Sequence, residues 1–352
     1  MSISQKMQSD IESVLNALIA STISSDEAAE RIYTVGTDFI RARSVPGSLA
    51  DGDEHDVDLY GDPTTPGVPS FFYELWSTLL NYIDRVPAEE HARDDCVARL
   101  VDTVRQLKAK PQLEGKDWLI AGDKCRWDSL PHLGRNVRDV YYDIDTTHID
   151  PAVLRSQEAQ AAVAGALQLE PQHLASEDPV SDTINLAKSR HRWLSLQAFI
   201  SGLWRDCGCN EYDIYAIWAL RPALEDWPES PPACGAQYET LEDSPAYLAF
   251  QVEAASIWIC NTAPLMYRCT TLMGPNGVPD WDMSAGAPGR GGRRWKGVDG
   301  YDSEHKRWQV WKGVLGEVVQ WCDRQGKDQM KGWKVKDAAI RSLEALKAAE
   351  HQ

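Results

Sequence analysis

Two polar side chains lie where the apolar pattern of a helix predicts burial, and they are the first candidates for chemistry. Glu253 falls in the middle of an apolar stripe on a helix expected to begin at Pro245, and His191 interrupts a second apolar stripe. A buried carboxylate must be paired or have a shifted pKa, because an uncompensated charge in a protein interior is costly. Two interpretations follow: a structurally paired carboxylate with a hydrogen-bonded core histidine, or the two proton-transfer groups of a catalytic site in an enclosed cavity.

Tryptophan is the compositional outlier of the chain, with fourteen residues against five phenylalanines. Trp308 and Trp311 fall on one apolar helix stripe, which predicts a core role. Indole rings also line pockets for flat organic ligands, since each offers a large rigid face and one N–H donor. Trp308, Trp311, Trp258 and Trp295 are therefore candidate substrate-binding residues, with core packing as the alternative.

A glycine-rich basic segment, 286–297, superficially resembles a phosphate-binding loop. It lacks the Gly-Lys-Ser/Thr ending of a P-loop, a preceding strand and an acidic residue at ribose-binding spacing. A surface loop is one interpretation; the other is a lid whose Arg293 and Arg294 contact an anionic or carbonyl group of a ligand. The wider stretch 274–300 holds eight glycines and three prolines. We expect it to have few backbone hydrogen bonds and to be the interior segment most sensitive to proteases.

The sequence contains no convincing metal site. Cys207 and Cys209 are the one close cysteine pair, and no second pair or histidine pair stands at zinc-binding spacing. The acidic run at 51–58 lacks the glycine and glutamate that an EF-hand calcium loop requires. We therefore expect neither a required metal nor a cofactor.

The net charge of the chain argues against some classes of binding partner. Lys and Arg number 36 and Asp and Glu number 53, so the formal net charge is −17, which argues against binding to nucleic acid or to an anionic membrane. No run of eighteen apolar residues predicts a membrane-spanning helix. Without a recognisable secretion signal, the eight cysteines are expected to be reduced thiols in a cytoplasmic protein.

Charge is also distributed unevenly along the chain. Residues 1–60 carry a net charge of −7 and residues 290–336 a net charge of +6. The basic end could dock an anionic ligand or the acidic end of another copy, which leaves a homo-oligomer open. A solvated surface with local charge fluctuation is the alternative.

Apolar residues recur at helical spacing through most of the chain, and alternating strand patterns are nearly absent. We predict an all-α fold, an irregular multi-helix domain with long Pro/Gly-rich loops. The stretches 44–69, 226–244 and 274–300 interrupt the helices. We expect three parts, of which the first and last could share one core: an N-terminal helical pair at 1–45, an acidic Pro-rich connection at 46–69 and a main helical domain at 70–352.

Several segments resemble signatures of DUF3632, an uncharacterised family of fungal helical proteins. The segments are Arg192-Trp-Leu-Ser-Leu-Gln-Ala-Phe199, Tyr215-Ala-Ile-Trp-Ala-Leu-Arg221, Ala223-Leu-Glu225, Trp295-Lys-Gly297, Gly300-Tyr-Asp-Ser-Glu-His-Lys-Arg-Trp308 and Trp311-Lys312. The resemblance covers roughly 71–322 and implies a fungal origin and an all-helical fold. It brings no established reaction, cofactor or catalytic residue. The chain departs from the family pattern at Pro222 and in the long glycine-rich stretch before Trp295.

Two function classes remain. In the first, an aromatic-lined cavity binds a small organic molecule. The chemistry would be a cofactor-free cyclisation or isomerisation in fungal secondary metabolism, and Glu253 or His191 would carry the proton. In the second, the protein is a non-catalytic protein–protein interaction module. A continuous enclosed pocket at Glu253 would favour the first class, and a filled core beside a broad exposed apolar patch the second.

Overall fold

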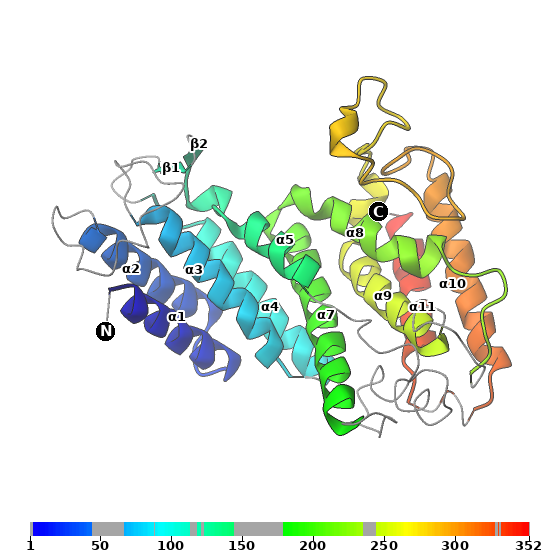
Figure 1. Cartoon of the computed structure of the whole chain (residues 1–352), viewed down its shortest axis with the longest axis horizontal. Helices are drawn as coiled ribbons and strands as arrows, with labels where there is room; N and C mark the ends of the chain where they lie inside the picture. Colours follow the sequence, from blue (N-terminus) through cyan, green and yellow to red (C-terminus); the bar gives the residue numbers. More distant parts are fainter. Residues whose placement is uncertain are drawn as a thin grey trace. The chain divides into compact units, whose positions relative to one another are not determined.

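The computed structural model describes residues 3–43, 67–87, 89–112, 118–120, 123–143, 179–234, 244–327, 330 and 332–351, with only the backbone of 123 and 179–189. These residues form ten α-helices, short 3₁₀ and π-helical turns and one pair of three-residue strands (Figure 1). The all-α prediction is confirmed. None of the described helices is long and apolar enough to cross a membrane.

The chain divides into two compact units, Met1–Ile144 and Asp145–Gln352. The sequence pattern predicts no boundary at this position. The expected connection 46–69 lies almost entirely outside the described residues. The N-terminal helical pair nevertheless packs on the next two helices within the first unit, so these four helices share one core.

The first unit is a small helical bundle with one hairpin. Its elements are α1 (Ile3–Ile19), α2 (Ser25–Arg43), α3 (Val68–Asn81), α4 (Glu90–Lys108), β1 (Trp118–Ile120), β2 (Asp123–Cys125) and α5 (Leu133–Asp143). The start of α2 follows from its sequence, since the Ser24 hydroxyl accepts a hydrogen bond from the Glu27 N–H at 3.2 Å. Gly36 lets α2 approach α3 closely, because a Cβ there would lie 2.4 Å from the Phe71 ring.

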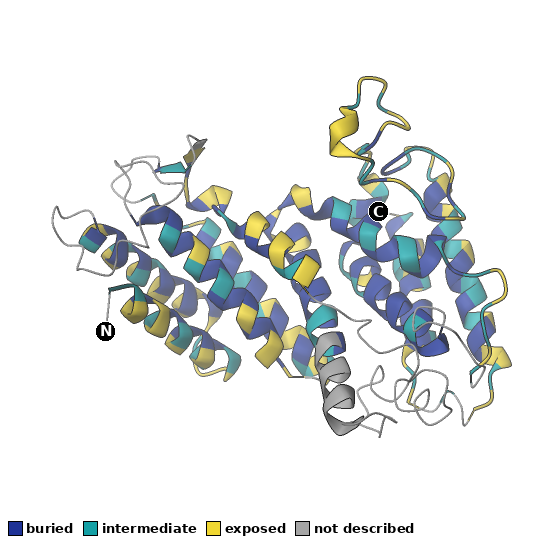
Figure 2. Cartoon of the chain, in the orientation of Figure 1, coloured by how far each residue is buried: buried dark blue, intermediate teal, exposed yellow. Residues whose placement is uncertain are grey.

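The second unit surrounds one central helix. Its helices are α7 (Pro179–Cys207), α8 (Asp213–Leu220), α9 (Pro245–Arg268), α10 (Lys306–Arg324) and α11 (Val335–Ala349). Helix α9 packs against α7, α8 and α11 and is buried along most of its length, as Figure 2 shows. It begins where the sequence predicts, with the Ser244 hydroxyl capping the Tyr247 N–H at 3.1 Å and Pro245 in the first turn.

A π-helical turn, Arg221–Glu225, follows α8 directly. Pro222 has no N–H to donate and cannot continue a regular helical ladder, so the backbone widens at this point. The Asp226 N–H closes the turn on the Arg221 carbonyl at 2.8 Å. The turn carries Glu225 into the interior, where it is 0% exposed.

The glycine-rich stretch is more ordered than its composition predicts. We call Gly286–Gly300 the strap. The Gly289 N–H bonds to the Met273 carbonyl at 2.8 Å, and the Met273 N–H bonds to the Asp299 carbonyl at 2.7 Å. Gly300, at φ +133°, lies so close to Thr271 that a Cβ would be 2.3 Å from its carbonyl oxygen. Glycine permits this close backbone pairing at both positions, and the expected protease sensitivity of 274–300 stays a prediction.

Candidate functional site

Glu253 lies on α9 and forms a buried ion pair with Arg190 of α7. Arg190 and Glu253 are 2% and 7% exposed, and the Arg190 Nη2 group donates to the Glu253 carboxylate. The Arg190 guanidinium also lies 5.8 Å from the centre of the Phe250 ring. This is the contact that the structural interpretation of Glu253 predicts. A proton-transfer role for Glu253 stays a prediction.

His191 is half-buried on α7, one residue after Arg190. Successive helical residues point in different directions, so His191 does not share the face that brings Arg190 to Glu253. Trp258 is fully buried, and its indole N–H donates to the Gln197 amide oxygen at 2.5 Å. Helices α7 and α9 therefore meet through a row of buried polar contacts that includes the predicted Glu253 and Trp258.

The other candidate tryptophans donate their indole N–H groups to the protein itself. Trp308 donates to the Glu350 carboxylate at 3.0 Å and Trp295 to the Val298 carbonyl at 2.9 Å. Trp311 donates to the Glu225 carboxylate at 2.8 Å. All three rings are buried, as the core-packing alternative predicts. A ligand-contacting role for these rings stays a prediction.

A buried charge cluster, missed in the sequence analysis, holds the strap in place. We call Glu225, Arg307, Trp311 and Gly292 the Glu225 cluster. Arg307 donates from Nε and Nη2 to the Glu225 carboxylate at 2.6 and 3.1 Å, and the Gly292 N–H donates to the same carboxylate at 2.8 Å. Arg307 is 1% exposed, and its Nη1 group donates to the Gly300 carbonyl at 2.6 Å. Both buried charges are paired and well supplied with hydrogen bonds.

The sequence contains one local signal for this cluster. Arg307 stands one helical turn before Trp311, on the apolar stripe of α10, in the same way that Glu253 stands on a stripe of α9. Its partner Glu225 ends one of the segments that resemble the family. Nothing local connects the two residues, because they are 82 positions apart.

Arg293 and Arg294 contact protein groups that follow the π-helical turn. The Arg294 Nε group donates to the Trp227 carbonyl and its Nη1 group to the Glu317 carboxylate, both at 2.8 Å. The Arg293 Nη2 group donates to the Asp226 carbonyl at 2.7 Å. Both side chains thus contact groups of their own unit, and a ligand-contacting role for Arg293 and Arg294 stays a prediction.

Much of the predicted basic end is neutralised internally. Six of its described cations form ion pairs within the second unit: Arg293 with Asp226, Arg294 with Glu317, Lys306 with Glu304, Arg307 with Glu225, Lys312 with Glu350 and Lys336 with Asp323. Paired cations contribute little to a long-range positive field. Docking of an anionic ligand or an acidic partner at this end stays a prediction.

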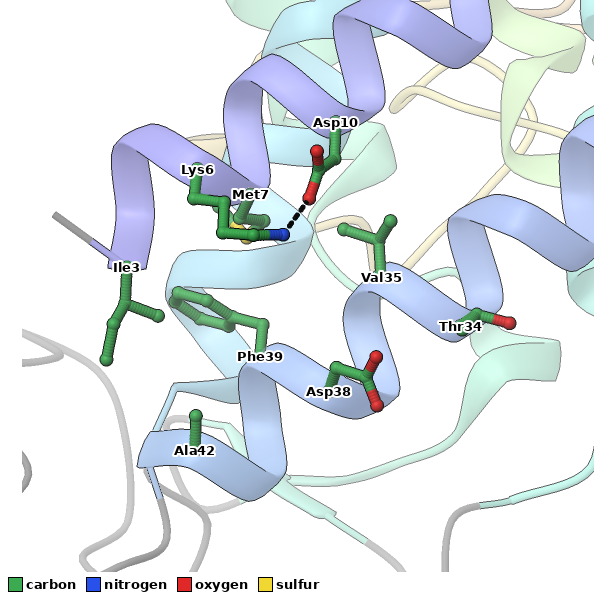
Figure 3. A pocket seen from close by; sticks show the side chains of 9 residues that line it. All are labelled: Ile3, Lys6, Met7, Asp10, Thr34, Val35, Asp38, Phe39 and Ala42. Carbon is green, nitrogen blue, oxygen red and sulfur yellow. Dashed lines mark hydrogen bonds and ion pairs between the residues drawn. The ribbon is translucent and has the colours of Figure 1, made fainter. Parts of the chain in front are cut away.

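A groove between α1 and α2 in the first unit has a cavity volume of about 340 Å³. Its lining, shown in Figure 3, is Ile3, Lys6, Met7, Asp10, Thr34, Val35, Asp38, Phe39 and Ala42. The spacing follows helical geometry, since lining residues of each helix recur at three- and four-residue steps. Short side chains at Val35 and Ala42 leave space on either side of Phe39. Neither the groove nor its residues were predicted from the sequence.

The groove combines an apolar floor with a charged rim. Met7 and Phe39 are each 3% exposed and form the floor. At the rim the Lys6 ammonium lies 2.6 Å from the Asp10 carboxylate, and this hydrogen bond and charge raise the pKa of Lys6. Asp38 is exposed beside them. Such an arrangement can bind an apolar body on the floor and a polar group at the rim.

Metal chemistry has no visible site in the described part of the chain. No group of three His, Cys, Asp or Glu residues is placed there to bind a metal ion. Cys207 and Cys209 are both buried and are not joined in a disulfide.

Comparison with known proteins places the chain in one family. The model of the family described as "Protein of unknown function (DUF3632)" matches residues 76–315. No characterised protein and no solved structure gave a significant match. The match confirms the resemblance found in the sequence. It includes the Glu225 cluster and the α7–α9 contacts but begins after the groove.

Proposed function

The chain belongs to the DUF3632 family, whose function is unknown, and we propose from its own geometry that it is a small-molecule-binding helical protein with its ligand site between α1 and α2. The observation that carries the proposal is the groove itself. Its volume of about 340 Å³ falls within the range of small-molecule pockets, and most of its lining is apolar.

The expected affinity is modest. Burial of about 200 Å² of apolar ligand surface would contribute about 5 kcal/mol at 25 cal/mol per Å². The loss of translational and rotational freedom on association offsets much of this gain. A ligand of about ten to fifteen non-hydrogen atoms should therefore bind with a Kd of about 1 mM or weaker.

The proposal concerns the N-terminal helices of this chain. Residues 3–42, which line the groove, precede the part that matches the family model. Cofactor-free cyclisation or isomerisation remains a further hypothesis that depends on Glu253 and His191. The Arg190 partner of Glu253 supports a structural role for that carboxylate, so we limit the proposal to binding.

Binding can be observed at the groove itself. Methyl-labelled methionine gives a separate NMR signal for Met7, one of six methionines, and a Met7→Leu variant assigns it. Titration with n-octanol should shift the Met7 signal in a saturable way. Val35→Phe should fill the groove and weaken binding about tenfold or more, whereas Ser9→Phe, on an exposed non-lining position of α1, should not. A Met7 signal that stays fixed under every apolar probe would exclude the groove as the ligand site.

A further inference from the structure

The charges at the rim of the groove are unequal. Lys6 and Asp10 form the one ion pair among the nine lining residues, so Asp38 has no partner within the groove (Figure 3). Asp38 is close enough to Lys6 to raise its pKa further, after the larger effect of Asp10. Two carboxylates and one ammonium leave the rim with one net negative charge.

Arg43, a buried cation at the end of α2, is engaged elsewhere in the first unit. The Arg43 guanidinium lies 5.3 Å from the centre of the Phe39 ring and donates to the Ser4 hydroxyl at 2.8 Å. Arg43 is buried and is not a lining residue of the groove. It therefore packs behind the floor and does not occupy the position beside Asp38 at the rim.

We propose that the ligand is an amphiphilic cation, a protonated amine on an apolar body of about ten to fifteen non-hydrogen atoms. Its ammonium group lies at Asp38, and its apolar body covers Met7 and Phe39. This inference rests on the proposed function. An anionic ligand of the same shape would meet the net negative rim and would have to displace Lys6 from Asp10.

Charge selectivity at an exposed rim is small and screened by salt. A single exposed ion pair changes affinity by about twofold to fivefold, and the effect decreases as the Debye length shortens. The whole chain carries a net charge of −17 and attracts cations non-specifically. The test must therefore read binding at the groove and not at the surface as a whole.

Three probes with the same eight-carbon chain separate charge from shape. We would titrate n-octylammonium, n-octanol and octanoate at low ionic strength, below their aggregation concentrations, and follow the Met7 methyl signal. Octylammonium should bind about twofold to fivefold more tightly than octanol, and octanoate should bind most weakly. Asp38→Asn should remove the preference for octylammonium. Asp26→Asn, which removes the same charge about 18 Å away along α2, should retain it.

The outcomes separate the two proposals. Equal affinities for all three probes, or tighter binding of octanoate, would overturn the cationic ligand while the groove remained the binding site. Unchanged selectivity in Asp38→Asn would also overturn the role of Asp38. No response of Met7 to any probe would instead overturn the proposed function itself.

Discussion

The Glu225 cluster and the α1–α2 groove contain the same kinds of group in opposite settings. Each brings a carboxylate, a cation and an aromatic ring together. In the cluster, Glu225 and Arg307 are 0% and 1% exposed and are bonded to backbone and indole groups as well as to each other. In the groove, the Lys6 and Asp10 side chains are 66% and 42% exposed at the rim above the apolar floor.

The difference shows which charged groups can bind a ligand. A buried charge whose hydrogen bonds are made by the protein holds structure together, because removing one partner strands the other. An exposed charge beside a hollow costs little to rearrange and can exchange its partner for a ligand. Burial of a carboxylate, as at Glu253, is therefore stronger evidence for a structural role than for a ligand-binding role.

The largest expected effect comes from breaking the Glu225 cluster. Glu225→Gln keeps the shape of the side chain but leaves the Arg307 charge buried without its counter-ion. We expect the free energy of unfolding to fall by about 3 to 5 kcal/mol, measured by urea denaturation. Asp10→Asn breaks the exposed pair in the groove and should leave the free energy of unfolding nearly unchanged. Equal losses in the two variants would contradict the contrast between the two regions.

The same variant should release the strap. Arg290, Arg293 and Lys296 have exposed side chains, but trypsin needs an opened backbone, and the strap is hydrogen-bonded at both of its ends. In the parent protein we expect the strap to resist brief trypsin treatment, contrary to the expectation from its glycine content. In Glu225→Gln, cleavage at these sites should be about tenfold faster or more. Rapid strap cleavage in the parent would show that the cluster does not secure it.

Glu253→Gln tests whether the second buried carboxylate is structural or catalytic. Loss of the Arg190 pair should reduce the free energy of unfolding by about 2 to 4 kcal/mol, somewhat less than at Glu225, which accepts more hydrogen bonds. Thermal denaturation of the parent and the variant side by side measures this loss. A variant that melts with the parent would contradict the structural role and favour the acid–base hypothesis for Glu253.

The smallest expected effect is a pH dependence of the free energy of unfolding that arises at the α10–α11 contact. Hydrogen bonds from Lys312, and then from Trp308, lower the pKa of Glu350 below its usual value of 4.5. A carboxyl group whose pKa is lower in the folded than in the unfolded protein stabilises the folded state at pH values above its unfolded pKa. This contribution is lost as the pH falls through the folded pKa. The parent should therefore lose up to about 1 kcal/mol more than Glu350→Gln between pH 6 and pH 3. Parallel pH profiles would exclude this contribution.

Local patterns in the sequence determined the secondary structure well. Apolar spacing predicted the helices, and Ser244 with Pro245 located the start of α9, because caps and periodicity depend on neighbouring residues. The burial of Glu253 followed from its place on an apolar stripe. The family resemblance was also legible from short aromatic segments.

Tertiary structure alone decided which residues pair in the buried ion pairs and where the groove lies. Glu253 meets Arg190 across 63 positions and Glu225 meets Arg307 across 82, and no local pattern specifies such pairs. The strap is ordered because distant groups accept and donate its hydrogen bonds, which its glycine content conceals. The groove exists because the side chains at Val35 and Ala42 are not covered by other residues. Whether a third element fills such a space depends on how the helices pack, and local residue spacing does not encode that packing.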